Sequence, residues 1–187
     1  MQRLKLVNLL KSFPEPVVLA IFMLINGSIS LIILGLIAKM SHLPFIFPSL
    51  GPTAFLHFFT PTLPSASPRN TIYGHIIGIV CGYGALLIFG LNEADSALLK
   101  GIPIGVDNHR ILAVGVSIGL TGALMILLKC SHPPAGATTL IISLGVITRP
   151  IHLLIMLLAV SLLVLQTIII NRLAGIDYPF WEKKHSQ

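Results

Sequence analysis

The sequence predicts an all-α, polytopic membrane protein with four long transmembrane helices, two short broken or half-helices, and two pseudo-repeats. Three observations support this prediction. The 187 residues are 55% hydrophobic and 10% charged, with a mean hydropathy of +0.93; soluble domains carry about 25% charged residues. Long charge-free runs recur along the chain, and shorter runs broken by proline and glycine lie between them. The same long and short pattern occurs twice.

Four stretches without Asp, Glu, Lys or Arg are long enough to cross a bilayer, since the hydrocarbon core requires about 20 apolar residues in a helix. They are residues 17–38, 71–91, 111–128 and 151–170. Residues 1–16 carry three basic side chains and end in Pro14-Glu15-Pro16, so we expect an interfacial N-terminal segment there. Residues 173–187 are expected to form a cytoplasmic tail.

Two shorter charge-free pieces, 44–59 and 133–148, are too short to cross comfortably and contain several prolines and glycines. Non-helical backbone at membrane depth is tolerated only where protein or a water-filled cavity satisfies its polar groups. These pieces are therefore predicted to be half-helices that line a site.

The two halves resemble each other in sequence. Residues 39–44 read KMSHLP and residues 129–134 read KCSHPP, while residues 51–56 read GPTAFL and residues 136–141 read GATTLI. We therefore expect one repeat at about 17–91 and a second at about 110–172. Duplicated halves whose hydrophobic segments are interrupted at matching places are typical of transporters.

Charge bias predicts that both termini are cytoplasmic. With four crossings or with six, eight of the twelve Lys and Arg residues fall on the side of the termini. The same count leaves the number of crossings open. Four crossings would make the halves parallel repeats, and six would make them inverted repeats.

The distribution of charge favours an anionic or neutral polar solute over a cation. All six acidic residues lie outside the long apolar runs, so no carboxylate is available to pair with a desolvated cation. Helices that start at Pro52 and Pro134 would point their free N–H groups and positive dipole ends at a ligand. Two such helix starts would suit a small anion.

Candidate solute-binding residues cluster in and near the two short pieces. They are Ser49, Gly51, Thr53, Arg69, Asn70, His75, His132, Gly136, Ala137, Thr138 and Thr139. Arg69 has no acidic residue nearer in sequence than Glu93, so its guanidinium is expected either to be solvated or to attract the anion. His42 and His132 occupy equivalent positions of the duplication, whereas His57 is predicted to be an interfacial or packing residue. Hydroxyls such as Thr138 could instead bond to their own helix.

Two stripes of small residues predict close helix packing in lipid. One contains Gly74, Gly78 and Gly82 at intervals of four, and the other contains Gly115, Gly119 and Ala123 at the same interval.

Residues 131–138, SHPPAGAT, resemble the signature of the HPP family of integral membrane proteins. Pro68-Arg69-Asn70 with Gly74-His75 resembles a second motif of that family. Residues 48–54 resemble its Gly-Ala-Ser-Ala segment, although Pro52 and Thr53 replace the usual Ala and Ser. The resemblance implies a domain usually described with four transmembrane helices, and some cyanobacterial and plastid members are implicated in nitrite transport.

The sequence thus predicts a transporter or channel for a small monovalent anion, with nitrite or nitrate as the expected solute. The alternatives are a non-transport binding or assembly protein and a membrane-embedded enzyme. The second alternative lacks a recognisable nucleophile or metal pattern, so we expect no catalytic residue, metal or cofactor. The expected partners are a small inorganic anion, the lipid bilayer and further copies of this chain, with no nucleic acid. The expected location is a bacterial inner or plasma membrane.

Overall fold

The structure, a computed structural model, describes residues 5–182 and contains no strand among them. The predicted all-α class is confirmed. In chain order the helices are α1 (Leu6–Leu9), α2 (Glu15–Ser41), α3 (Leu50–Phe59), the 3-10 helix η2 (Pro64–Ala66), α4 (Pro68–Ile88), α5 (Ala97–Lys100), α6 (Asn108–Leu127), α7 (Ala135–Ser143) and α8 (Pro150–Leu173). By length and composition, α2, α4, α6 and α8 are able to cross a membrane, and they match the four predicted runs.

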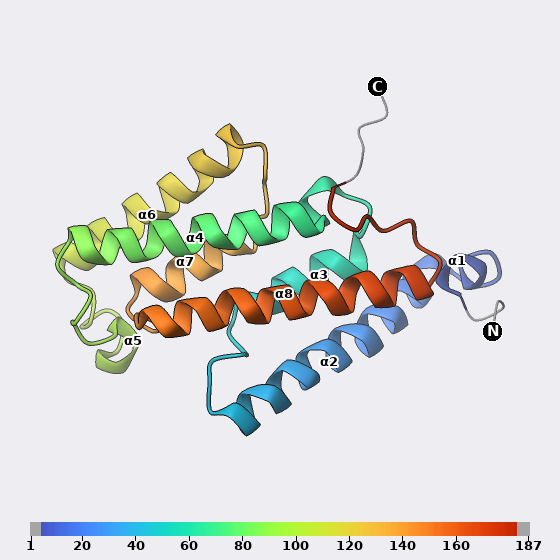
Figure 1. The fold of residues 1–187 in the computed structure, drawn as a ribbon, viewed down its shortest axis with the longest axis horizontal. Coiled ribbons are helices and arrows are strands. Elements are labelled where there is room, and N and C mark those ends of the chain that lie inside the picture. The colour runs from blue at the N-terminus through green and yellow to red at the C-terminus, as the bar shows by residue number, and fades with distance from the viewer. Residues whose placement is uncertain (1–4, 183–187) are drawn as a thin grey trace.

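The four long helices lie roughly along the long axis of the molecule, and α3 and α7 are short helices among them (Figure 1). The chain runs in the same direction through α2 and α4, and in the opposite direction through α6 and α8. It can do so because α3 and α7 each carry the chain part of the way back. The six helices α2, α3, α4, α6, α7 and α8 thus alternate in direction along the chain. Each half has the order long, short, long, and the two halves run in opposite directions.

Proline and short polar residues fix where the long helices begin. Helix α2 starts beside Pro14, with Glu15 in its first turn, and ends at His42, whose φ of 57° is left-handed. Helix α4 has Pro68 at its first position, where a missing N–H costs nothing, and the Ser67 hydroxyl accepts a hydrogen bond from the Asn70 N–H at 3.3 Å. Asp107 caps α6 in the same way.

The apolar core lies between α2, α3, α4, α7 and α8. Leu34, Phe58, Leu86, Ile142 and Leu163 are fully buried there. Large apolar side chains also cover the outside of the helices, as at Leu24 of α2 and Ile126 of α6, which are 69% and 74% exposed. Apolar residues on both faces of a helix are expected where the outer solvent is lipid.

The glycine stripe of α4 packs as predicted, against the second broken segment. A Cβ added at Gly74 would lie 2.7 Å from the Cβ of His132, and one at Gly78 would lie 2.8 Å from the carbonyl oxygen of Ala135. The stripe of α6 behaves differently. Gly115 and Gly119 are exposed, and a Cβ added at either would meet nothing within 4 Å, so the close helix packing predicted for this stripe is not made within residues 5–182. Small residues allow close packing but do not determine which helix face receives a neighbour.

Both terminal segments lie at the end of the molecule where α2 begins and α8 ends (Figure 1). In the predicted interfacial segment 1–16, helix α1 is a single turn, and residues 1–4 fall outside the described residues. In the predicted tail 173–187, the part up to residue 182 packs against the helices. The fully buried Tyr178 donates its hydroxyl hydrogen to the carbonyl oxygen of Ala66.

Candidate functional site

The first turns of α3 and α7 meet inside the protein. Ser49, the residue that caps α3, shares a hydrogen bond of 2.7 Å with the hydroxyl of Thr138, which lies one turn into α7. Both side chains are fully buried. The two broken segments, 89 residues apart in sequence at this contact, therefore form one site.

A histidine of α4 completes this contact. Nδ1 of His75 lies 2.8 Å from the Thr138 hydroxyl, and Nε2 of the same ring lies 3.2 Å from the hydroxyl of Thr53 on α3. The Thr53 hydroxyl also lies 2.8 Å from the carbonyl oxygen of Ser49. His75 and Thr53 are fully buried, so the polar atoms of this group bond to one another in place of water.

The polar group continues from Thr53 toward the end of the molecule that carries the termini. Nε2 of His132 lies 3.3 Å from the Thr53 hydroxyl, and Nδ1 lies 2.7 Å from the carbonyl oxygen of Ser65 and 3.4 Å from the Thr71 hydroxyl. Thr71 is in turn 2.8 Å from Nε2 of His57. Nδ1 of His57 lies 3.1 Å from the hydroxyl of Thr167 on α8.

These contacts form a continuous chain in which, from Thr138 onward, hydroxyls and imidazoles alternate. We call it the histidine chain. Its members are, in order, Ser49, Thr138, His75, Thr53, His132, Thr71, His57 and Thr167. Each of the three rings uses both of its nitrogens, and the ring centroids of His75 and His57 lie 5.2 and 6.0 Å from that of His132.

One tautomer in the chain follows from geometry. A carbonyl oxygen only accepts hydrogen bonds, so Nδ1 of His132 must carry the hydrogen that it donates to Ser65. In a neutral ring Nε2 then has a free lone pair, and it faces the Thr53 hydroxyl. The Thr53 hydroxyl has one hydrogen for two acceptors, the Ser49 carbonyl and Nε2 of His132, while Nε2 of His75 can either accept from it or donate to it. The arrangement of hydrogens along the chain therefore has more than one solution.

The site is closed to the surface in this structure. All eight members of the histidine chain are fully buried. The groove beside the two helix starts is apolar, lined by Pro52, Phe55, Leu56, Pro133, Pro134 and Ala137. The hydroxyls of Ser49 and Thr138 are therefore covered by protein on all sides.

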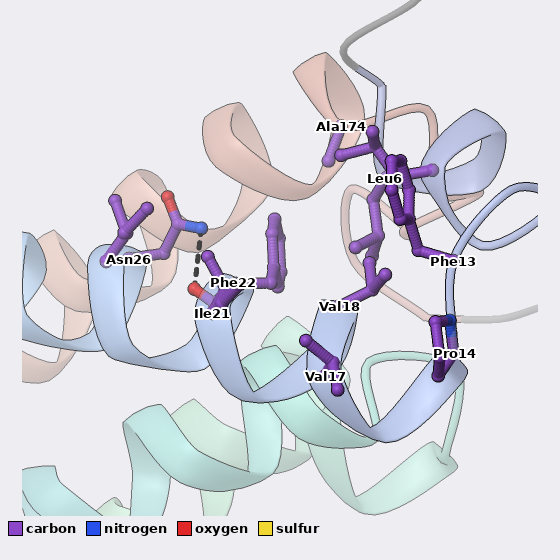
Figure 2. A pocket seen from close by; sticks show the side chains of 11 residues that line it. Leu6, Phe13, Pro14, Val17, Val18, Ile21, Phe22, Asn26 and Ala174 are labelled. Carbon is purple, nitrogen blue, oxygen red and sulfur yellow. Dashed lines mark hydrogen bonds between the residues drawn. The ribbon is translucent and has the colours of Figure 1, made fainter.

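A second groove lies at the termini end, between α1, the start of α2 and the end of α8 (Figure 2). Its volume is about 410 Å³, and its lining is apolar apart from Asn26. The side-chain nitrogen of Asn26 donates to the carbonyl oxygen of Phe22 at 2.8 Å, on its own helix. None of the described residues that line this groove is charged, so they do not form an anion site.

The structure brings together some of the predicted solute-binding residues and separates others. Ser49, Thr53, His75, His132 and Thr138 belong to the histidine chain. Thr139 faces away from it and bonds to the hydroxyl of Thr121 on α6 at 2.9 Å. The remaining predicted residues lie at the edges of the site: Gly51, Gly136 and Ala137 are half-buried at the helix starts, and Arg69 and Asn70 lie at the start of α4.

Arg69 has an acidic partner, contrary to the expectation based on sequence distance. Its guanidinium lies 3.5 Å from the carboxylate of Glu182 and donates to the carbonyl oxygen of Lys129 at 3.0 Å. Glu182 is remote in sequence and reaches Arg69 because the segment after α8 folds back along the start of α4. The guanidinium thus fastens this segment and the loop before α7 to α4.

Sequence reasoning missed three members of the histidine chain and favoured one histidine that does not belong to it. His57, Thr71 and Thr167 lie in three different helices, and no short-range spacing connects them. His57, predicted to be an interfacial or packing residue, is fully buried, and both its nitrogens have hydroxyl partners. His42 is exposed at the end of α2, although the duplication aligns it with His132. A useful signal was available: polar residues at 71 and 167 interrupt otherwise apolar helices.

The fold and the site define a polytopic helical membrane protein whose two broken helices meet at a buried, carboxylate-free polar group. The defining transmembrane region of the HPP family matches residues 14–179, and the chain belongs to this family. It is also 29% identical over 101 residues to a transmembrane protein of Dictyostelium discoideum. That match covers 54% of this chain and 30% of the relative, so the chain spans less than a third of the relative's length. No solved structure matches the chain.

Proposed function

We propose that the protein is a membrane carrier for a small monovalent anion, with nitrite or nitrate as its solute, and has no catalytic activity. The single observation that carries the proposal is the direct contact between the first turns of α3 and α7, through Ser49 and Thr138. Each first turn brings the positive end of a helix dipole to the same place, while the N–H groups of Leu50, Ala135, Gly136 and Ala137 already donate to carbonyl oxygens of the preceding turns. Such an arrangement attracts negative charge.

The surrounding side chains support an anion. The hydroxyls of Ser49, Thr53 and Thr138 can each donate a hydrogen bond to an oxyanion, as can His75. No acidic residue lies between residues 16 and 92 or between 108 and 176, the two stretches that contain α3, α4, α7 and α8. A bound anion would therefore meet donors without a competing carboxylate.

The closed form of the site is one expected state of a carrier. The halves run in opposite directions, as in transporters that expose one central site to each side in turn. Opening would require the Ser49–Thr138 bond to break, and the incoming anion would replace it with two bonds to itself. Eight of the twelve basic residues fall on the side of the termini, so the proposal places both termini in the cytoplasm.

The proposal also includes a homo-oligomer. The stripe of Gly115, Gly119 and Ala123 on α6 is exposed, and small residues favour close approach of helices in lipid. A second copy of the chain is the simplest neighbour for that face.

Uptake by purified protein in liposomes tests the proposal. We expect uptake of nitrite or nitrate above that of protein-free vesicles, and weaker uptake of formate, chloride and urea. Absence of uptake for all five solutes would favour the alternative in which the buried polar group only stabilises the fold and the protein serves binding or assembly.

Thr138→Val tests the site itself. It removes a hydroxyl at nearly constant volume, and a hydrogen bond to a charged group is worth about 1.5–3 kcal/mol, so we expect apparent affinity to fall about tenfold or more. The matched control is Thr62→Val, because Thr62 is exposed in the connection between α3 and α4. Equal kinetics for the two variants would assign the Thr138 hydroxyl to the fold alone.

A further inference from the structure

The histidine chain has a property that anion binding does not require. It joins three imidazoles through hydroxyls in strict alternation, with no link longer than 3.4 Å. One end, Ser49 and Thr138, is the proposed anion site. Near the other end, His132 bonds to the carbonyl of Ser65, a half-buried residue in the connection that precedes α4 at the termini end. The chain thus extends from the anion site toward one surface.

We propose, building on the proposed anion transport, that the histidine chain carries one proton for each anion, so that the protein is an electroneutral proton–anion symporter. An imidazole accepts a proton on one nitrogen and releases another from the opposite nitrogen, and a hydroxyl can do the same through its oxygen. Chains that include histidine serve as proton relays in membrane transporters.

The proton steps balance along the chain. A proton that reaches Nε2 of His132 makes an imidazolium. Its Nδ1 proton then passes to the Thr71 hydroxyl, which gives its own hydrogen to Nε2 of His57, and the His132 ring is neutral again with its hydrogen on Nε2. From that tautomer the opposite transfer can start: protonation at Nδ1 of His132 releases the Nε2 proton to Thr53, whose hydroxyl passes its own hydrogen to Nε2 of His75. No bond other than those to hydrogen changes, and no electron is transferred.

The charge inventory explains why a proton should accompany the anion. A bare anion in a low-dielectric interior is strongly unfavourable unless an opposite charge lies near it. Among residues 5–182, the titratable side chains in ring contact with the three imidazoles are one another and the Tyr178 phenol, whose ring centroid is 6.2 Å from that of His57. Arg69, the nearest basic residue along α4, is engaged with Glu182. His75, directly bonded to Thr138, is therefore the group that can supply the positive charge, as an imidazolium, when the anion binds.

Coupling is measured in liposomes that contain a pH-sensitive dye, with the membrane potential set by potassium and valinomycin. The probes are sodium nitrate and sodium nitrite, and protein-free vesicles provide the blank because nitrous acid crosses lipid by itself. A pH difference of about one unit, acidic outside, should drive accumulation of the anion to about tenfold over the outside concentration in one-to-one symport. The membrane potential should have no effect, and the lumen should acidify as anion enters.

His75→Gln and His57→Gln identify the path, because glutamine keeps hydrogen-bonding groups but does not carry a proton at neutral pH. We expect both variants to lose the accumulation driven by the pH difference, whereas His42→Gln, at an exposed position, should retain it. Size-exclusion profiles report whether each variant is folded. If a variant fails to fold, the pH-driven accumulation measured with the unmodified protein still decides whether a proton accompanies the anion.

The outcomes separate the two proposals. Anion uptake that follows the membrane potential and ignores the pH difference would overturn proton coupling and leave anion transport standing. Full pH-driven accumulation in both His75→Gln and His57→Gln would overturn the assignment of the path to the histidine chain. Absence of uptake for every anion would overturn the proposed function and, with it, the symport.

Discussion

At the scale of single residues, Arg69 shows how tertiary contacts set the role of a charged side chain. Its guanidinium bonds to the backbone of Lys129, a residue held at a left-handed φ of 51°, and so fixes the loop that carries His132. It also bonds to the side chain of Asn70 and pairs with Glu182. Surface ion pairs contribute about 0–1 kcal/mol, so the bond to the Lys129 carbonyl is the more important of these contacts.

Arg69→Gln is therefore expected to destabilise the protein by about 1–2 kcal/mol, while Glu182→Gln should cost less than about 1 kcal/mol. Thermal unfolding in detergent measures both. The Debye length is about 30 Å at 0.01 M salt and about 8 Å at physiological salt. If Arg69 acts through the fold, the decline in uptake caused by Arg69→Gln should be the same at both salt concentrations. A decline found only at low salt would mean that the guanidinium attracts the anion from solution.

At the scale of secondary structure, the contact of α4 with α7 positions the site. The glycine stripe lets the backbone of α7 approach α4, and this approach brings Thr138 to His75. Helices with larger residues at these positions would lie farther apart, beyond hydrogen-bonding distance. The two short helices could not hold this geometry alone, because isolated helices of about ten residues are marginal.

Gly78→Ala should disrupt this contact, because the new methyl group would lie 2.8 Å from the Ala135 carbonyl oxygen and 3.0 Å from the Thr139 hydroxyl. We expect a loss of about 1–3 kcal/mol of stability, the usual cost of overpacking. The matched control on the same helix is Gly84→Ala, which meets nothing within 4 Å and should be neutral or gain up to about 1 kcal/mol from helix propensity. Equal melting temperatures for the two variants would contradict close α4–α7 packing.

At the scale of the whole molecule, the direction of the six segments determines which loops share a side. In the arrangement of Figure 1, the loop after α6 lies at the same end as the start of α2, and the segment after α4 lies at the other end. A protein with only four alternating crossings would place these two loops the other way round. The number of crossings, four or six, therefore determines whether the two halves form an inverted pair. Transporters built from inverted repeats use such a pair to expose a central site to each side in turn.

Single cysteines at exposed positions test this topology with a membrane-impermeant maleimide in sealed vesicles. We expect Ser12→Cys and Ser131→Cys to react from one side and Ala94→Cys from the other. Both native cysteines are buried, and burial raises the pKa of the Cys130 thiol, an effect only partly opposed by Arg69. Their reaction should therefore be slow. Labelling of Ser12→Cys and Ala94→Cys from the same side would favour four crossings.

The sequence by itself determined the membrane class, the four long helices and the two broken segments, because hydropathy and the placement of proline and glycine are local properties. It also identified Ser49, Thr53, His75, His132 and Thr138 as candidates, since they lie in or beside the broken segments. Only the tertiary structure decided that these residues form one chain, that His57, Thr71 and Thr167 extend it, and that His42 lies outside it. Hydrogen bonds between residues 14 to 110 positions apart depend on how helices pack, and helix packing is not encoded by any short stretch of sequence.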